Sequence, residues 1–207
     1  MKSFLKKNVI EGGLDEVARG CLFGRVYAAA VIWRNDRELD NLLKLFNIEK
    51  MVIRDSKKIK PLKRKELRDY IETFALDYSV SWACQKEVDK YNIRNATFKA
   101  MHRSLDNLVL KPQSLIVDGN DFEIYKMTNH QCIIKGDDTY TSIAAASILA
   151  KVYHDEYIEE LVKNNPDLKK YDIHNNMGYG TKKHIDAIKK HGITKYHRKT
   201  FGICKKY

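Results

Sequence analysis

Four acidic residues stand in local settings that suit chemistry. Asp15 and Glu16 follow an apolar segment with two glycines, Asp118 ends the apolar run LIVD, and Asp155 follows the alanine-rich run IAAASILAK. Gathering carboxylates is unfavourable because each repels the next and burial opposes ionisation. A hard divalent cation offsets that cost, and oxygen ligands suit Mg²⁺ and Mn²⁺. We therefore predict that Asp15, Glu16, Asp118 and Asp155 bind Mg²⁺ or Mn²⁺ in one site.

The charge of the chain points to an anionic partner. The formal net charge is +11, and residues 160–207 hold 12 Lys/Arg against 4 Asp/Glu, which accounts for +8 of it. A localised basic excess is typical of nucleic-acid binding. Two metal ions about 4 Å apart can activate water and stabilise a leaving oxygen in an in-line displacement. An acidic metal site on a basic chain therefore predicts chemistry on a phosphodiester.

Length and composition indicate a single globular unit. A chain of 207 residues can bury roughly 70% of its unfolded surface without a disulfide or structural metal. No apolar run reaches about 18 residues, so no membrane span is expected. The four cysteines are scattered, which predicts free buried thiols and a reducing, cytoplasmic compartment. A monomer is the default expectation.

Apolar periodicity predicts a mixed α/β fold. Strand patterns come first and alternate later with helical ones, which favours a mixed sheet covered on both faces. Strands are expected at residues 8–14, 23–33, 78–84, 114–117 and 131–135, and helices at 63–75, 92–108, 140–163 and 181–190. We divide the chain into a catalytic part, residues 1–165, and a basic helical C-terminal extension packed on it, residues 166–207.

These elements must bring the acids together. Asp118 lies where a buried strand stops, the usual place for a site in an open α/β sheet. Asp155 lies four residues after Lys151 on one helix face, so the two can pair, or Lys151 can reach a phosphate. Asp15 and Glu16 are adjacent and would point to opposite faces of a regular strand. We expect the strand to end or distort there, as its glycines would allow.

An ordered set of motifs then becomes informative. The segments DEVARG, FGRVYAAAV, DSKK, LIVDGN, KGDDTYTSIAAASILAKVYHD, MGYGTKKH and HRKTF follow one another from about residue 9 to residue 201. In this order they resemble the type 2 ribonucleases H (ribonuclease HII). The resemblance covers nearly the whole chain. It implies a ribonuclease H-like fold with a mixed five-stranded sheet, helices on both faces and a C-terminal helical extension.

The resemblance also implies an activity and its residues. It implies hydrolysis of the RNA strand of RNA–DNA hybrids and incision at ribonucleotides embedded in duplex DNA, with Mg²⁺ or Mn²⁺, leaving a 3′-hydroxyl and a 5′-phosphate. The four catalytic acids of the family fall on Asp15, Glu16, Asp118 and Asp155. Its substrate-binding positions fall on Ala18, Arg19, Gly20, Lys57, Lys151 and Tyr179, with Tyr179 sensing the junction and the two lysines contacting phosphate.

Three positions depart from the family pattern. Ala18 stands where the first glycine of the substrate loop is expected, and a methyl group there could restrict the backbone and crowd the sugar. That puts the preference for single embedded ribonucleotides in question more than hydrolysis. Arg25 replaces a frequent proline, and His154 replaces a frequent arginine. We interpret both as changes in packing or local electrostatics.

Two other functions fit the same sequence features. One is another nuclease with this fold, such as a junction resolvase, which would cut branched DNA and not hybrids. The other is a hybrid-binding protein with a decayed site, which the presence of all four acids argues against. The C-terminal FGICKKY contains no clear sliding-clamp peptide, so clamp binding by that route is not expected.

Overall fold

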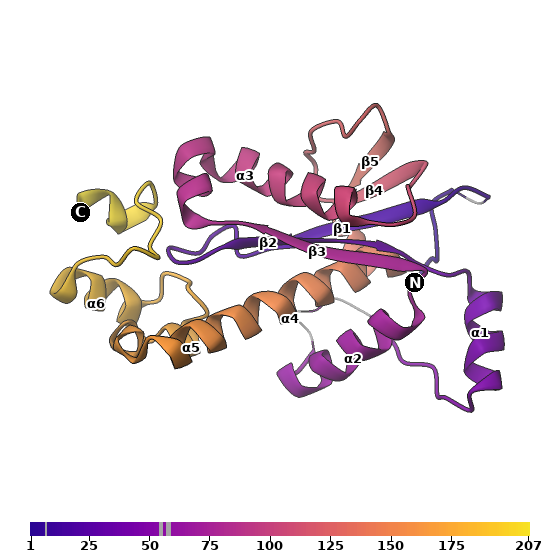
Figure 1. Ribbon diagram of the computed structural model, residues 1–207, viewed down its shortest axis with the longest axis horizontal. Helices are drawn as coiled ribbons and strands as arrows, with labels where there is room; N and C mark the ends of the chain where they lie inside the picture. The colour runs from indigo at the N-terminus through magenta and orange to yellow at the C-terminus, as the bar shows by residue number, and fades with distance from the viewer. Residues whose placement is uncertain (7, 54–55, 57–58) are drawn as a thin grey trace.

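A five-stranded mixed sheet is the centre of the computed structural model, which describes residues 1–6, 8–53, 56 and 59–207. The strand order is β3-β2-β1-β4-β5 (Figure 1). β1 pairs antiparallel with β2, as does β2 with β3, whereas β1, β4 and β5 run parallel. The bounds are Glu11–Val17, Val26–Ile32, Asp77–Ala83, Ser114–Asp118 and Asn129–Ile133 for β1 to β5. The predicted fold class is confirmed.

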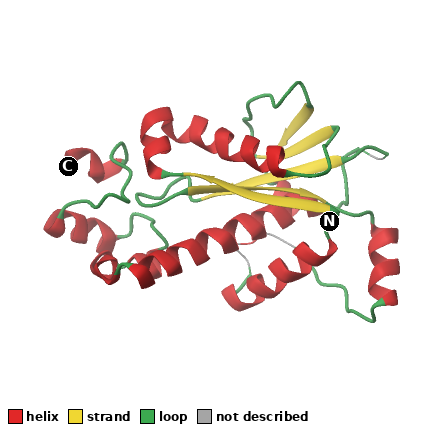
Figure 2. Ribbon diagram, viewed as in Figure 1, coloured by secondary structure: helices red, strands yellow, loops and turns green. Residues whose placement is uncertain are grey.

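Helices cover both faces of this sheet (Figure 2). α3 (Gln85–Asn107) lies on one face, and α4 (Thr141–Asn164) lies on the other with α2 (Pro61–Phe74) outside it. α1 (Asp36–Leu45) follows β2, and α5 (Ile173–Asn176) and α6 (Lys182–His191) follow α4. No helix within the described ranges is long and apolar enough to cross a membrane.

The first half of α4 is buried on all sides, as its uncharged sequence predicts. Every residue from Ser142 to Ala150 is buried. The alanines at 144–146 pack in one core cluster with Ala29 and Val31 of β2. The second half leaves the sheet and joins an apolar cluster with Phe23, Leu168, Tyr171 and Ile188. One helix thus connects the catalytic sheet to the C-terminal elements.

Two local predictions were incomplete. The expected helix start at Asn92 is confirmed: Asn92 has φ 64°, its Oδ1 accepts a hydrogen bond from the Asn95 amide, and it forms a kink between two helical parts of α3. The residues before it, from Gln85, form an additional turn of helix. α1 was not predicted, although Asn35 caps it and its buried side chains Leu39 and Leu43 have helical spacing.

Gly13 is the position where β1 approaches α4 most closely. A Cβ at this position would lie 2.5–2.6 Å from Ser142 atoms, including backbone carbon. We expect Gly13→Ala to lower the free energy of unfolding by about 3 kcal/mol, at the upper end for overpacked cores. Gly12→Ala is the matched control, because its Cβ would meet side-chain carbons at 3.2 Å or more. Urea unfolding measures both; equal losses would contradict the close approach.

Candidate active site

The sheet register brings Asp15 and Asp118 side by side. Leu14 of β1 lies opposite Val117 of the parallel neighbour β4, so Asp15 and Asp118 follow at the next step of the two strands. Paired residues of neighbouring strands point to the same face. That face is the one covered by α4, because Asp15 accepts a hydrogen bond from Ser147 of that helix. Two of the predicted acids therefore share one edge of the sheet.

Asp15 is held in an environment that opposes its charge. Only 5% of the residue is exposed, and its Oδ1 accepts the Glu16 amide at 2.7 Å. Burial raises the pKa of Asp15 well above its usual value, and the charges of Glu16 and Asp118 raise it further. Each of these effects would be reversed by a bound cation. The repulsion among these carboxylates therefore destabilises the metal-free fold, and a bound metal ion would offset it.

Glu16 belongs to the regular part of strand β1. β1 continues in regular register through both acids, with Asp15 opposite Ala29 and Glu16 opposite Ala28. The strand ends one residue after Glu16, at Val17, and Ala18 follows with φ 70°, so the expected end lies just beyond the two acids. Alternation starts the Glu16 side chain from the other face of the strand, but its carboxylate stays close enough to Asp15 to raise the pKa of that residue. Near the end of the strand its Oε1 accepts a hydrogen bond from Arg19 Nη1 at 3.1 Å.

Asp118 is oriented by the turn after β5. The Gly136 amide donates to Asp118 Oδ1 at 2.7 Å. A Cβ at residue 136 would lie 2.6 Å from the Ile143 side chain and 3.4 Å from that same Oδ1. Glycine is therefore the residue that lets the backbone approach the carboxylate.

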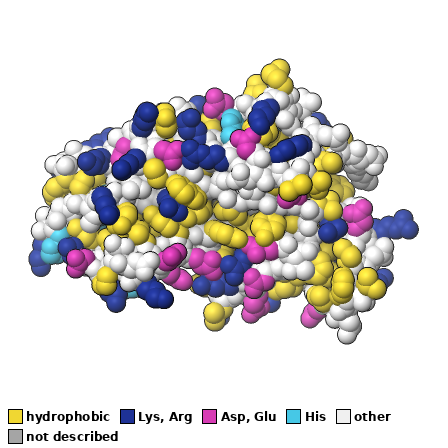
Figure 3. Space-filling view, viewed as in Figure 1, with side chains coloured by type: hydrophobic (Ala, Val, Ile, Leu, Met, Phe, Trp, Pro, Cys, Tyr) yellow, Lys and Arg dark blue, Asp and Glu magenta, His cyan; other side chains and the backbone are white. Residues whose placement is uncertain are grey.

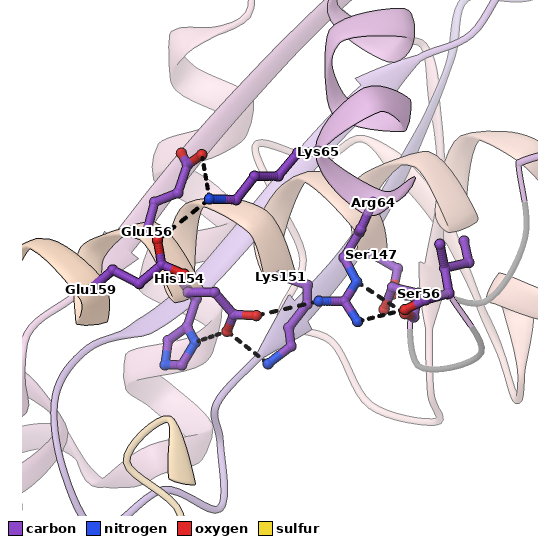
Figure 4. Close-up of polar contacts among 10 residues, drawn as sticks. Ser56, Arg64, Lys65, Ser147, Lys151, His154, Glu156 and Glu159 are labelled. Carbon is purple, nitrogen blue, oxygen red and sulfur yellow. Dashed lines mark hydrogen bonds and ion pairs between the residues drawn. The ribbon is translucent and has the colours of Figure 1, made fainter. Parts of the chain in front are cut away.

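Asp155 is surrounded by positive and polar donors. Lys151 Nζ donates to Oδ1 at 2.7 Å, Arg64 Nη1 to Oδ2 at 3.3 Å, and His154 Nδ1 lies 3.0 Å from Oδ1 (Figure 4). Burial opposes ionisation of Asp155, but the donors outweigh it and lower the pKa of the carboxyl. The predicted Lys151–Asp155 pair is confirmed. His154 is fully buried, and burial lowers the pKa of its imidazole.

Arg64 is a member of this site that sequence reasoning missed. Besides Asp155 it donates to the carbonyls of Ser56 and Ile59 at 3.1 and 2.9 Å. The Ser56 hydroxyl in turn lies 2.9 Å from the Ser147 hydroxyl, which bonds Asp15. A signal was present, because residues 64, 67 and 71 share the buried face of α2. A charged residue on an apolar helix face indicates a buried polar partner.

The acids are gathered but do not converge on one point. Within the part of the chain that the structure describes, no three His, Cys, Asp or Glu side chains are arranged to hold one ion. Asp15 and Asp118 are neighbours, Glu16 is turned toward Arg19, and Asp155 toward its basic partners. The donor set consists of carboxylate oxygens, the chemistry that suits Mg²⁺ and Mn²⁺. It fits such a cation chemically.

The predicted substrate loop lies beside this edge. Ala18 adopts φ 70°, a conformation that favours glycine, yet only 2% of the residue is exposed. Its methyl group is therefore buried in the protein, and the expected effect on a bound sugar stays a prediction. Cys21 forms an isolated β-bridge with Tyr179, and 40% of the Tyr179 residue is exposed to solvent. Burial raises the pKa of Tyr179 to about 12, so it is a neutral phenol at physiological pH.

The remaining residues singled out in the sequence lie in different surroundings. Lys57 lies outside the described residues. Gly20 is exposed between Arg19 and the Tyr179 ring, whose edge carbon would lie 4.0 Å from a Cβ there. Arg25 stacks on the rings of Trp82 and Tyr157, 3.6 and 4.4 Å from their centroids, which gives the residue a packing role. All four cysteines are free, but Cys84 and Cys132 are only partly buried.

Basic side chains form a broad surface near the site. In Figure 3 they spread over α3 and around α6 and the C-terminal turn. α3 contributes five of them, which the sequence analysis did not single out: Lys86, Lys90, Arg94, Lys99 and Arg103. Arg94 and Arg103 are paired with Asp121 and Glu87, which leaves Lys86, Lys90 and Lys99 as the exposed α3 cations outside those two pairs.

Comparison with known proteins identifies the family. The family model described as Ribonuclease HII matches residues 12–204. The chain belongs to the ribonuclease HII family. Ribonuclease HII of Phocaeicola vulgatus is 46% identical over 200 residues, covering 97% of this chain and 92% of that protein. Ribonuclease HII of Bacteroides thetaiotaomicron is also 46% identical, over 97% of this chain and 93% of that protein. Membership makes the chain a hydrolase that acts on phosphodiester bonds.

Solved structures show the same fold. The ribonuclease H2 from Pyrococcus horikoshii superposes with a TM-score of 0.74 at 23% identity and covers 95% of each chain. Bst-RNase HIII, in a crystal structure with Mn²⁺, gives 0.66 at 18% identity, covering 95% of this chain and 68% of its own. The resemblance that the motif order suggested is confirmed, as is the ribonuclease H fold.

Proposed function

We propose that this chain hydrolyses the RNA strand of RNA–DNA hybrids and incises at ribonucleotides embedded in duplex DNA. The observation that carries the proposal is the closeness of Asp15 and Asp118, one step beyond the last paired residues of β1 and β4, on the strand that leads into the loop of Arg19 and its bridge to Tyr179. Acids for phosphodiester cleavage thus lie beside groups that can read a sugar. The family match and the basic surface support the same proposal.

The chemistry assigned to the acids is in-line displacement. We infer that Asp15, Glu16, Asp118 and Asp155 would hold Mg²⁺ or Mn²⁺, which when bound activates water and neutralises developing charge. A water oxygen bonds to phosphorus while the bond from phosphorus to O3′ breaks, and a proton passes to that O3′. The products are a 3′-hydroxyl and a 5′-phosphate. Asp15 and Asp118 supply the fixed charge that orients the reacting groups at the sheet edge.

Recognition of the ribonucleotide is assigned to the loop and Tyr179. Only a 2′-hydroxyl distinguishes RNA from DNA at one nucleotide. Backbone groups at the exposed residues 19 and 20, which follow the buried Ala18, can approach that hydroxyl, and the exposed part of the Tyr179 ring can stack on the neighbouring deoxyribose. Lys151 and Lys57 are proposed phosphate contacts, and lysines on α3 and in the C-terminal extension would hold the backbone without sequence preference.

The deciding experiment is cleavage of two labelled substrates resolved on a gel. One is a DNA duplex with a single ribonucleotide, the other a full RNA–DNA hybrid, each with Mg²⁺, Mn²⁺ or EDTA. We expect metal-dependent cutting of both, with 3′-hydroxyl ends. Asp118→Asn should lose cleavage by roughly 10²-fold or more while still binding the hybrid. Cutting of neither substrate by the native protein, or cutting of branched DNA alone, would overturn the proposal.

The buried Ala18 methyl leads to a prediction about substrate choice. Because the methyl points into the protein, Ala18→Gly should change the ratio of cleavage rates on the two substrates by less than about tenfold, or 1.4 kcal/mol. Tyr179→Ala is the contrast, since it removes an exposed ring and should lower cleavage at the single ribonucleotide. The measurement is kcat/KM on each substrate. A larger change from Ala18→Gly than from Tyr179→Ala would contradict this placement.

A further inference from the structure

Arg198 is the largest fully buried side chain among the residues that the structure describes, and the proposed chemistry does not use it. It has no exposed surface. Its guanidinium donates to three backbone carbonyls, those of Arg19 at 2.9 Å, Gly24 at 3.0 Å and Arg25 at 3.0 Å. Among the described residues no carboxylate forms an ion pair with it. These carbonyls and the Phe201 ring, whose centroid lies 5.2 Å from Cζ, stabilise the buried charge, and an apolar side chain could not supply the three donors.

The three carbonyls all belong to the connection between β1 and β2. This connection, residues 18–25, carries the predicted substrate loop and forms only isolated bridges instead of a ladder. Its carbonyls therefore need other donors. Arg198 supplies them from the opposite end of the chain, and its own amide donates to the Leu22 carbonyl at 2.9 Å. The planar guanidinium fixes the positions of several carbonyls at once.

The preceding residue connects the same segment to Tyr179. The His197 ring lies 3.1 Å from the His184 ring, Nε2 to Nε2, and His184 Nδ1 lies 2.9 Å from the Tyr179 carbonyl. Burial and the neighbouring His184 lower the pKa of His197 to about 4, so this pair is neutral at physiological pH. The dipeptide 197–198 thus contacts the support of Tyr179 with one side chain and the Arg19 backbone with the other.

We propose that Arg198 is a positioning residue that sets the distance between the Arg19 loop and Tyr179, and thereby the selectivity for a ribonucleotide next to DNA. This rests on the proposed function. Arg198 does not touch the substrate; it acts through the carbonyl of Arg19, in the connection whose Cys21 bridges Tyr179 and whose Leu22 amide donates to the Gly178 carbonyl at 2.9 Å. A single embedded ribonucleotide offers one productive register, whereas a hybrid offers a ribose at every step. Misplacing the loop should therefore affect the first substrate more.

The test compares Arg198→Lys with Tyr171→Phe on both substrates. Lysine keeps the charge but cannot donate to three carbonyls in fixed directions. Tyr171→Phe removes one buried hydrogen bond of the C-terminal elements, to the Gly192 carbonyl at 3.1 Å, without touching the loop. We expect Arg198→Lys to lower kcat/KM about tenfold more on the single-ribonucleotide duplex than on the hybrid. Tyr171→Phe should lower the thermal midpoint and leave the ratio unchanged.

Each outcome decides the proposal. Equal losses on the two substrates, or no loss, in a folded Arg198→Lys protein would overturn it. If that variant does not fold by circular dichroism, Arg198→Gln, which buries no charge, carries the same comparison. Failure of both to fold would overturn it in favour of a structural role. If the native protein cuts neither substrate, the proposed function fails instead, and that result is separate from any effect of Arg198.

Discussion

Replacing Asp15 with asparagine should abolish metal-dependent cleavage and raise the melting temperature of the metal-free protein. Cleavage should fall by roughly 10²-fold or more, because a fixed charge at the sheet edge is lost. Stability should rise because burial, Glu16 and Asp118 all oppose the charge of Asp15 in the folded state. A gain of about 1 kcal/mol corresponds to roughly 2–4 °C for a chain of this size.

The pH dependence of this gain has a defined sign. Asp15 has a higher pKa when folded than when unfolded, so the folded state retains the proton to higher pH. Stability of the native protein is therefore lost as pH rises from about 3.8 through the folded pKa. With EDTA present, the advantage of Asp15→Asn should be larger at pH 8 than at pH 5.

A control separates local crowding from net charge. Asp186→Asn removes one exposed negative charge on α6 and should change neither activity nor the pH trend. Adding Mn²⁺ should raise the melting temperature of the native protein more than that of Asp15→Asn. Differential scanning fluorimetry measures all three proteins. A lower melting temperature for Asp15→Asn in EDTA at pH 8 would contradict the electrostatic reading of the site.

The sequence predicted well those features that depend on local pattern. Helical spacing located the Lys151–Asp155 pair, and an apolar run with no charge predicted the buried first half of α4. A short strand ending in an acid located Asp118 at a sheet edge. These features follow from neighbours within one element, where periodicity alone fixes which side chains share a face.

Features that depend on contacts between distant segments could not be predicted in the same way. Arg64 reaches Asp155 across 91 positions, and Arg198 reaches Arg19 across 179. HRKTF was recognised as a motif, but nothing local shows that its arginine is buried against backbone carbonyls. The conformation of Ala18 was equally hidden, because a buried methyl in a left-handed residue depends on what surrounds the loop.

Replacing Asp155 with asparagine should also abolish cleavage, but with the opposite effect on stability. Asp155 is attracted to Lys151 and Arg64, and its carboxyl has a lowered pKa. Removing one member of a partly buried charge network leaves two cations without their partner. We expect a loss of about 3 kcal/mol, the lower end for breaking a buried pair, or roughly 6–12 °C in melting temperature.

The sign of the pH effect again follows from the direction of the shift. Because the folded pKa of Asp155 is depressed, its contribution is fully present above the unfolded value of 3.8 and is lost as pH falls through the folded pKa. The deficit of Asp155→Asn in EDTA should therefore be constant between pH 5 and pH 8, unlike the gain from Asp15→Asn.

The neighbouring Glu156 provides the matched control. It pairs with Arg68 at 3.1 Å and with Lys65 at 3.8 Å, but its side chain is 35% exposed. Exposed pairs contribute about 1 kcal/mol or less, so Glu156→Gln should retain cleavage and lose little stability. If Asp155→Asn were as stable as Glu156→Gln, the ion pairs of Lys151 and Arg64 with Asp155 would not contribute measurably to stability, and the prediction would be wrong. Opposite stability effects at Asp15 and Asp155, with loss of cleavage at both, would instead show that both acids serve one site. In that site Asp15 is repelled by neighbouring carboxylates and Asp155 is attracted by neighbouring cations.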